Sequence, residues 1–329
     1  MKVIAKKEVI NQAGTPTDNC HASTVLPLDN GEILASWFGG TKEGKDDVRI
    51  FVSKRVDGVW QTPVKIAVDE ETPHWNPVLF KLNDGRIALY FKYGKSIDLV
   101  WKTYVVYSED NGNTWTAPAE LVEGDTTGGR GPVKNKPIYL ADGTLLAPAS
   151  HEPSKETWAA FCDISKDNGK TWEMSAYVPT GEGEDFVPMI QPTLWQDDEG
   201  NVHMLLRTSK EKVFKSDSAD GGRTWCKAYD TGLLNPNSGI DLVKDDKEIY
   251  LVYNPTDKNW GDRTPLLLAV SKDNGNSWET VLTLEEAEVG REEDVEYSYP
   301  AITAHGGKLH ITYTYNRVSI VYWEVEIIG

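Results

Sequence analysis

The sequence predicts an all-β protein, a six-bladed β-propeller of four-stranded antiparallel blades, because it contains two internal repeats and an unpaired strand at each end. The first repeat is a motif, Ser-x-Asp-x-Gly-x-Thr/Ser-Trp, that begins at Ser108, Ser165, Ser218 and Ser271. Its copies are 57, 53 and 53 residues apart. A period of this length is typical of stacked or radial repeats, so it outweighs the two-domain expectation from length alone.

The motif has the chemistry of a tight turn that leads into a strand. Its Asp can accept hydrogen bonds from nearby backbone amides, and its Gly can adopt a positive φ. The Trp recurs once per unit, where a large side chain can pack between neighbouring units. We therefore expect the motif to be structural and the chemistry to lie elsewhere.

A second repeat is visible without the motif. Each copy runs from polar or small residues into apolar alternation, then through a hairpin-type turn into another strand. The six copies begin at His21, Trp75, Val133, Ile190, Pro236 and Tyr297. A third strand then leads to the motif, which is degenerate in the first unit, between Ser53 and Trp60. Six such units predict six blades.

The two ends of the chain supply the strands that remain. The last unit ends with the strand expected near Ser319 to Ile327 and lacks a fourth strand, while the strand expected near Val3 to Ile10 precedes the first unit. Pairing the two would close the ring and remove an exposed edge. We therefore expect one domain, residues 1–329, in which the N-terminal strand completes the last blade.

Composition narrows the classes of partner. The chain of 329 residues has 34 Lys and Arg against 51 Asp and Glu, a net charge of −17. This charge argues against nucleic acid and anionic membranes. Cys20, Cys162 and Cys226 are odd in number and lack metal-type spacing, so we expect buried thiols, no metal and no cofactor. The first residues lack a signal-peptide pattern, which predicts a cytoplasmic protein, or a secreted or periplasmic one if further residues precede Met1.

The site is expected where the inner strands begin, around the central axis. These positions are unusually polar, and convergent polar groups at one mouth of a fold are typical of a binding site. From the first strands they are His21, Asn76, Lys134, Asn135, Gln191, Asn237, Asp241, Tyr297 and Tyr299; from the ends of the second strands they are Lys92, Ser150, Glu152, Arg207, Asn254, Tyr315 and Arg317. Trp75, Trp101, Trp158 and Trp260 lie outside the motifs and could stack on a sugar or pack in the core.

The repeated motif resembles the Asp-box of sialidases, and the whole chain resembles the sialidase superfamily. Sialidases hold the carboxylate of a terminal sialic acid with three arginines. By this resemblance Arg207 matches the second arginine, Arg263 the third, and Tyr297 the tyrosine nucleophile. Arg317, after the sixth second strand, would add to a local positive patch. Guanidinium groups suit a carboxylate because their planar fork makes bidentate hydrogen bonds.

Two departures place the chain outside the true sialidases. His21-Ala22-Ser23 stands where the first blade of a sialidase has Arg-Ile-Pro, and Gln191 stands where the Glu partner of the Tyr is expected. An amide cannot accept the phenol proton, so Glu296, Glu152 or His21 would have to activate Tyr297, or water would attack instead. The acid is expected in the loop GGTKEGKDDV, as Glu43, Asp46 or Asp47.

Three functions follow as expectations. The first is an exo-acting glycoside hydrolase that removes a terminal, acidic sugar from an oligosaccharide or glycoside, with Tyr297, His21 and either Glu43 or Asp47 as catalytic residues. The second is a lyase in which His21 takes a proton next to a uronate carboxylate and Tyr297 donates one. The third is a glycan-binding propeller without catalysis. The sequence carries no signal for an oligomeric state.

Overall fold

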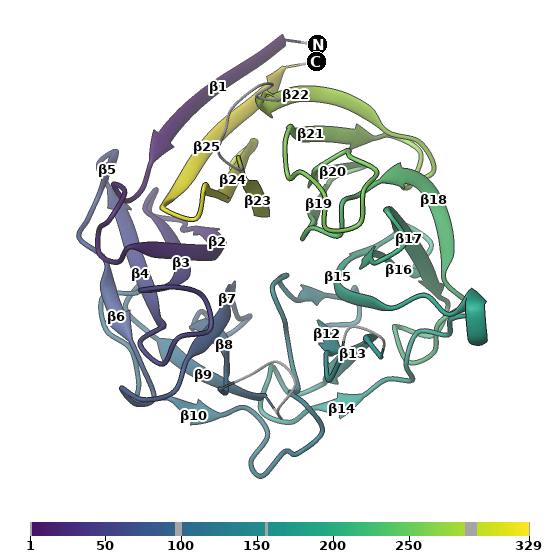
Figure 1. Ribbon diagram of the computed structural model, residues 1–329, viewed down its shortest axis with the longest axis horizontal. Helices are drawn as coiled ribbons and strands as arrows, with labels where there is room; N and C mark the ends of the chain where they lie inside the picture. Colours follow the sequence, from purple (N-terminus) through teal and green to yellow (C-terminus); the bar gives the residue numbers. More distant parts are fainter. Residues whose placement is uncertain (1, 96–100, 155–156, 287–294, 329) are drawn as a thin grey trace.

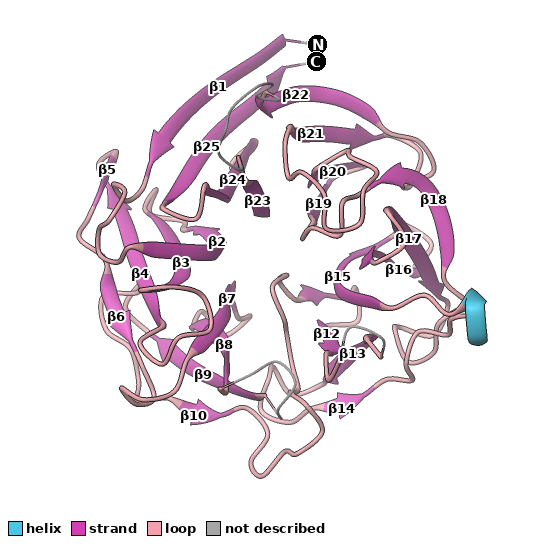
Figure 2. Cartoon of the chain, viewed as in Figure 1, coloured by secondary structure: helices cyan, strands magenta, loops and turns pink. Residues whose placement is uncertain are grey.

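The computed structural model describes residues 2–95, 101–154, 157–286 and 295–328. In these residues the chain forms 25 strands and one 3-10 turn, η1 (Gly183–Asp185). The strands make six antiparallel sheets around a central axis (Figures 1 and 2). The prediction of a six-bladed all-β propeller is therefore confirmed. No helix within the described ranges is long and apolar enough to cross a membrane.

The first three blades follow the chain in order. Blade 1 contains β2 (Asn19–Pro27), β3 (Ile33–Gly40), β4 (Arg49–Val56), β5 (Val59–Trp60) and β6 (Val64–Ile66). Blade 2 contains β7 (His74–Lys81), β8 (Ile87–Tyr93), β9 (Lys102–Ser108) and β10 (Ala119–Glu120). Blade 3 contains β11 (Ile138–Tyr139), β12 (Leu145–His151), β13 (Ala159–Ser165) and β14 (Glu173–Met174).

The last three blades complete the ring. Blade 4 contains β15 (Met189–Gln196), β16 (Val202–Thr208), β17 (Lys212–Ser218) and β18 (Tyr229–Leu234). Blade 5 contains β19 (Asp241–Asp245), β20 (Glu248–Tyr253), β21 (Leu266–Ser271) and β22 (Glu279–Glu285). Blade 6 contains β23 (Tyr297–His305), β24 (Lys308–Tyr315), β25 (Ser319–Ile328) and, as its outer strand, β1 (Lys2–Val9).

The pairing of β1 with β25 closes the ring, as the sequence predicts. The register runs from Lys2 opposite Ile328 to Val9 opposite Val321, and the two chain ends lie side by side (Figure 1). Because β1 satisfies the outer edge of β25, blade 6 has four strands, like blades 2 to 5; in blade 1 the outer edge of β4 pairs with both β5 and β6.

Two inner strands are shorter than the repeat pattern predicts. In blade 3 only Ile138 and Tyr139 pair as β11, although the pattern begins at Val133. Asn135, ahead of that strand, instead donates from Nδ2 to the carbonyl oxygens of Gln191 and Pro192, at 3.0 Å each. The Asn135 side chain thus links blade 3 to blade 4, at a point where the repeat pattern predicts backbone pairing within blade 3. In blade 5 the inner strand begins only at Asp241.

The repeated motif forms the same turn in all four copies. In the second copy the Oδ1 of Asp167 accepts from the amides of Lys170 and Thr171, at 3.1 and 2.8 Å, and Oδ2 accepts from the Thr171 hydroxyl at 2.6 Å. Ser165 Oγ accepts from the amide of Gly169 at 2.8 Å. These contacts lower the pKa of Asp167 to about 2, chiefly through the Thr171 hydroxyl and amide.

In three of its four copies the motif also packs closely against the preceding blade. Gly275, with φ +79°, lies so close to Trp195 of blade 4 that an added Cβ would approach its Cζ2 to 2.9 Å. Gly112 and Gly222 make equally close approaches to Leu34 and Leu146 of the preceding blades. Only glycine combines this conformation with so little space.

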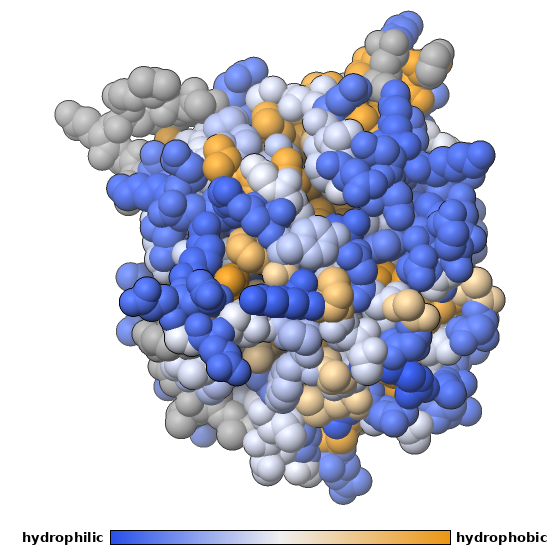
Figure 3. Space-filling model, turned by 90° about the vertical axis from the view of Figure 1, so that its right-hand side faces the viewer, coloured by the Kyte–Doolittle hydropathy of each residue, from blue (hydrophilic) through white to orange (hydrophobic). Residues whose placement is uncertain are grey.

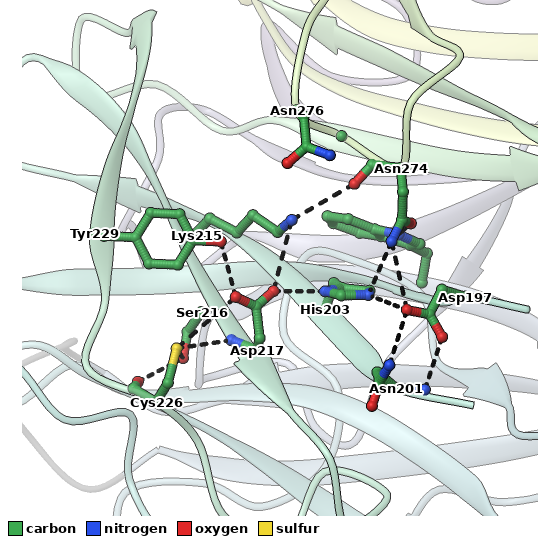
Figure 4. A network of polar contacts seen from close by, with 12 residues as sticks. Asp197, Asn201, His203, Lys215, Ser216, Asp217, Cys226, Tyr229, Asn274 and Asn276 are labelled. Carbon is green, nitrogen blue, oxygen red and sulfur yellow. Dashed lines mark hydrogen bonds and ion pairs between the residues drawn. The ribbon is translucent and has the colours of Figure 1, made fainter. Parts of the chain in front are cut away.

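A polar network joins blades 4 and 5 near this contact (Figure 4). His203 lies between two carboxylates, with Nδ1 2.5 Å from Asp217 and Nε2 2.8 Å from Asp197. Asn274, from the turn of blade 5, donates to Asp197 and accepts from the indole of Trp195. The rim of the ring near β18 is mostly hydrophilic, with apolar residues in small scattered groups (Figure 3).

Candidate functional site

A left-handed residue occurs once in each blade at the start of its inner segment. Their φ angles lie between 46° and 63°, a range uncommon for residues other than glycine. They are Ala22, Asn76, Lys134, Gln191, Asn237 and Tyr299. In blades 1, 2, 4 and 6 the ladder also skips register there. Such a bulge re-aims a side chain, and it brings Gln191 and Tyr299 to one cavity.

The cavity has a volume of about 550 Å³ and lies at this mouth of the ring. That volume suits a sugar-sized ligand. Trp75, Trp158 and Trp260 form apolar parts of its wall, and Arg207, Arg263 and Arg317 form cationic parts. The remaining lining comes from Asn19, Lys42, Glu43, Glu152, Ile190, Gln191 and Tyr299.

Arg207, at the end of β16, is held by three polar side chains. Its Nε donates to Asn237 Oδ1 at 2.7 Å. Its Nη1 donates to Gln191 Oε1 at 3.1 Å and to the phenol oxygen of Tyr299 at 2.5 Å. Three of the left-handed residues thus converge on one guanidinium group, which is only 2% exposed. Within the described residues, its Nη2 makes no such contact, so it is the donor that remains for a ligand.

Aromatic rings enclose the same guanidinium group. Its Cζ lies 5.6 Å from the ring centroid of Trp158 and 5.5 Å from that of Trp260. The Tyr299 ring is also 5.5 Å away, and Arg263 lies over that ring at the same distance. Cation–π contacts of this kind hold a cation in place while water is excluded.

Glu296 is a carboxylate shared by two arginines. Arg263 Nη1 donates to its Oε1 at 2.8 Å, and Arg317 Nε donates to its Oε2 at 2.7 Å. Arg317 also pairs with Glu43 through Nη1. Burial would raise the pKa of Glu296, but the opposing effect of His21 and the two arginines leaves it well below its usual range. Every nitrogen of Arg317 therefore meets a carboxylate.

The position of Arg317 follows from the hairpin between β24 and β25. Asn316 and Arg317 have φ angles of 50° and 55°, and the amide of Val318 donates to the carbonyl of Tyr315 at 3.1 Å. Two consecutive left-handed residues are typical of a type I′ turn, which suits Asn. The ion pairs of Arg317 help to offset the strain of its own conformation.

Tyr297, expected as the nucleophile, is not among the residues that line the cavity. It is only 1% exposed, and its ring packs on Tyr315 at 5.0 Å between centroids. Tyr299 lines the cavity instead. The bulge between Ser298 and Ala301 causes this shift, because it breaks the alternation that would place both tyrosines alike. Tyr315 is likewise absent from the cavity wall.

His21 is buried behind Tyr299. Its ring centroid lies 4.1 Å from that of Tyr299, and Nδ1 is 2.9 Å from the hydroxyl of Thr314. Burial, followed by the charge of Arg317, holds the pKa of His21 well below its usual value. The imidazole packs against the back of the tyrosine and does not reach the cavity surface, which does not suit the base of a lyase.

Of the three acids expected in the first-blade loop, Asp46 is exposed and does not line the cavity, and the other two differ from each other. Glu43 lines the cavity, paired with Arg317. Asp47 does not: its Oδ2 accepts from the amide and hydroxyl of Thr41 and so caps its own loop. Asp47 therefore lies outside the site, contrary to expectation.

Two predicted lysines are buried supports. Lys92 donates to Thr103 Oγ1 at 2.8 Å and to the carbonyl of Arg130 at 3.0 Å, and burial lowers its pKa to about 8. Lys134 donates to the carbonyls of Ile240 and Pro300, and burial lowers its pKa to about 7. Neither belongs to the cavity wall, because backbone carbonyls inside the ring hold both ammonium groups.

The predicted asparagines also act from behind the wall. Asn237 orients Arg207 and is fixed by donating to Asn259 Oδ1 at 2.9 Å. Asn135 bridges blades 3 and 4, and Asn76 is buried at its bulge. Trp101 packs on Trp75, with 5.5 Å between ring centroids, rather than facing a ligand.

Several residues of the site have little signal in the sequence. The sequence suggests for Glu296 only a role in activating a tyrosine, whereas in the structure it pairs with two arginines. Its position directly before β23 was the available signal. Asn19 and Lys42 line the cavity from blade 1 and its loop, and neither belongs to the repeat pattern. In the described residues no group of three or more His, Cys, Asp or Glu is arranged to hold a metal.

Taken together, the ring and its polar mouth define a propeller of the sialidase superfamily. The family model for the BNR repeat-like domain matches residues 31–311, and the chain belongs to this family. A sialidase of Bacteroides fragilis (strain YCH46) is 25% identical over 274 residues, which are 77% of this chain and 44% of that protein. The chain spans less than half the length of the curated relatives it matches.

Solved structures share the fold at lower identity. A protein of unknown function from Dyadobacter fermentans DSM 18053 superimposes with a TM-score of 0.78 at 18% identity, over 99% of both chains. A Streptococcus pneumoniae sialidase superimposes with a TM-score of 0.70 at 14% identity, over 97% of this chain and 70% of that one. Likeness at this level of identity shows the fold alone.

Proposed function

We propose that the protein is a glycoside hydrolase that releases a terminal, acidic sugar from a glycan or glycoside. One observation carries the proposal: Arg207 and Arg263 lie over the ring of Tyr299 in a cavity walled by tryptophans. Guanidinium groups recognise a carboxylate, and indole rings suit the apolar face of a sugar. The sialidases among its relatives, by their names, act on such a sugar.

The same geometry supports a division of roles. Nη2 of Arg207 and the groups of Arg263 not bound to Glu296 would hold the sugar carboxylate. Tyr299, whose oxygen already accepts from Arg207, would face the anomeric carbon as nucleophile or orient the attacking water. Gln191 supplies no base, so the phenol proton has to leave to water or to the substrate.

A substrate panel tests the proposal. The panel consists of 4-nitrophenyl glycosides of sialic acid, of glucuronic acid and of glucose, each incubated with the unmodified chain and with Arg263→Ala. We expect turnover of an acidic glycoside, no turnover of the glucoside, and a loss of about 2 kcal/mol or more in transition-state stabilisation in the variant. Equal turnover of the neutral glycoside, or no turnover of any, would overturn the proposal.

One observation favours a second candidate, a glycan-binding propeller without turnover. Gln191 stands where an activating carboxylate is expected, and its amide is committed to Arg207. Such a protein would bind an acidic sugar saturably, as calorimetry would show, while releasing no product. Nothing in the placement of His21 favours the lyase.

A further inference from the structure

Glu152 lies in the cavity beside the residues proposed to hold the sugar. It directly follows β12 in blade 3, lines the cavity together with Arg207 and Trp158, and is only 7% exposed. A carboxyl group this deeply buried is normally paired with a cation. The hydrogen bonds and charges around Glu152 therefore indicate its chemical role.

A short chain of hydrogen bonds fixes one of its two oxygens. The amide of Gln191 donates to Ser150 Oγ at 3.3 Å, and Ser150 Oγ donates to Glu152 Oε1 at 2.8 Å. Because Ser150 already accepts from Gln191, its own hydrogen is directed at Oε1. Oε2 makes no hydrogen bond with any residue that the structure describes, so it is the oxygen on which a proton can sit.

The other acidic groups of the site differ from Glu152 in their ion pairing. Glu43 and Glu296 are ion-paired with arginines. Within the described part of the chain, Glu152 takes part in no ion pair. Burial raises its pKa, against smaller effects of Ser150 and Arg207 that lower it. The group thus keeps its proton to a higher pH than an exposed carboxyl group would.

We propose that Glu152 is the general acid of the reaction and donates its Oε2 proton to the glycosidic oxygen. The inference rests on the proposed function. In the first step the anomeric carbon bonds to the oxygen of Tyr299, or directly to that of water, and the proton of the attacking oxygen passes to bulk water. The bond to the glycosidic oxygen breaks, and its electron pair stays on that oxygen, which takes the proton of Glu152. On the Tyr299 route a second water then attacks the anomeric carbon, the bond to Tyr299 breaks, and the phenolate takes a proton from bulk water. The carboxylate of Glu152 recovers the proton that this second water loses, or on the direct route a proton from bulk water.

The assignment predicts a dependence on the leaving group. In Glu152→Gln, kcat/KM for a methyl glycoside of the acidic sugar should fall by about 10²–10⁴, the usual contribution of a general acid. The 4-nitrophenyl glycoside, whose leaving oxygen needs no proton, should lose less than about tenfold. The alkaline limb of the pH profile for the methyl glycoside should also disappear. Glu279→Gln, an exposed change on β22, is the matched control and should leave both rates unchanged.

The outcomes separate the two proposals. Equal losses on the two glycosides, or a rise in KM with kcat unchanged, would show that Glu152 only binds the sugar and would overturn the inference alone. Absence of turnover by the unmodified protein on both glycosides would overturn the proposed function and this inference with it. A selective loss on the methyl glycoside supports both.

Discussion

Tyr299 of blade 6 accepts a hydrogen bond from Arg207 of blade 4, with 2.5 Å between the phenol oxygen and Nη1. The two residues are 92 positions apart in the chain, and the arrangement of the blades around one axis brings them together. Tyr297, two residues before Tyr299, packs instead on Tyr315. This difference between the two tyrosines can be tested directly.

Tyr299→Phe should lower kcat for an acidic glycoside by at least about 100-fold, because the oxygen at the cavity surface is lost. Tyr297→Phe removes an oxygen outside the cavity and should change kcat less than threefold, which makes it the matched control. Initial rates of 4-nitrophenol release measure both. A larger loss of kcat in Tyr297→Phe than in Tyr299→Phe would show that Tyr297 is the catalytic tyrosine.

Arg207→Lys should lower kcat/KM for the acidic glycoside by about 2–4 kcal/mol in free-energy terms. A lysine keeps the charge but cannot donate to Asn237, Gln191 and Tyr299 at once, and it lacks the planar guanidinium group that contacts the two indole rings. Far-ultraviolet circular dichroism should confirm an intact fold. A variant with the kinetics of the original protein would show that charge alone suffices.

Gly275→Ala should destabilise the fold more than Gly307→Ala. Both glycines have positive φ, +79° and +76°, so each substitution carries a backbone cost of about 1–3 kcal/mol. Only at Gly275 would the new Cβ meet the rigid ring of Trp195, at 2.9 Å, which adds about 1–3 kcal/mol of overpacking. Urea denaturation followed by tryptophan fluorescence measures the difference, and equal midpoints would contradict the proposed wedge.

The free energy of unfolding of Asp167→Asn should fall less steeply than that of the original protein as the pH is lowered from 7 to about 2. The pKa of Asp167 is lowered to about 2 in the folded protein and is about 3.9 in an unfolded chain. Its ionised form therefore adds stability above about pH 4, and this contribution is lost as pH falls through about 2. The variant should be less stable than the original at pH 7 and should approach it near pH 2. Denaturation curves across that range test the sign.

The sequence was sufficient to predict the six-bladed architecture because the repeated units can be recognised directly from the residues. The motif at Ser108, Ser165, Ser218 and Ser271 recurs at nearly constant spacing, and the unpaired strands near Val3 and Ser319 leave one way to close the ring. The tightness of the contact between Gly275 and Trp195 could not be foreseen, since it depends on how two blades approach.

The site was less predictable, for two physical reasons. Alternation along β23 gives Tyr297 and Tyr299 the same face, and only the bulge after Ser298 distinguishes them. Ion pairing is also a property of three-dimensional neighbours: nothing in the chain links Glu296 to Arg263, 33 residues earlier. Arg207 lines the cavity at the expected end of its blade, because it lies next to the last residue of β16, a strand whose place in the repeat is unambiguous.

The left-handed residues at the start of the inner strands can vary in side chain without changing the strands of the blades. At a bulge the side chain is released from the alternation that the core requires, so Asn, Lys, Gln or Tyr can occupy equivalent places in different blades without disturbing the sheets. Two of these positions, Gln191 and Tyr299, line the cavity, whereas Ala22, Asn76, Lys134 and Asn237 do not. A propeller of this kind can acquire a new specificity by exchanges at the two positions that face the ligand, with the strands of the blades left intact.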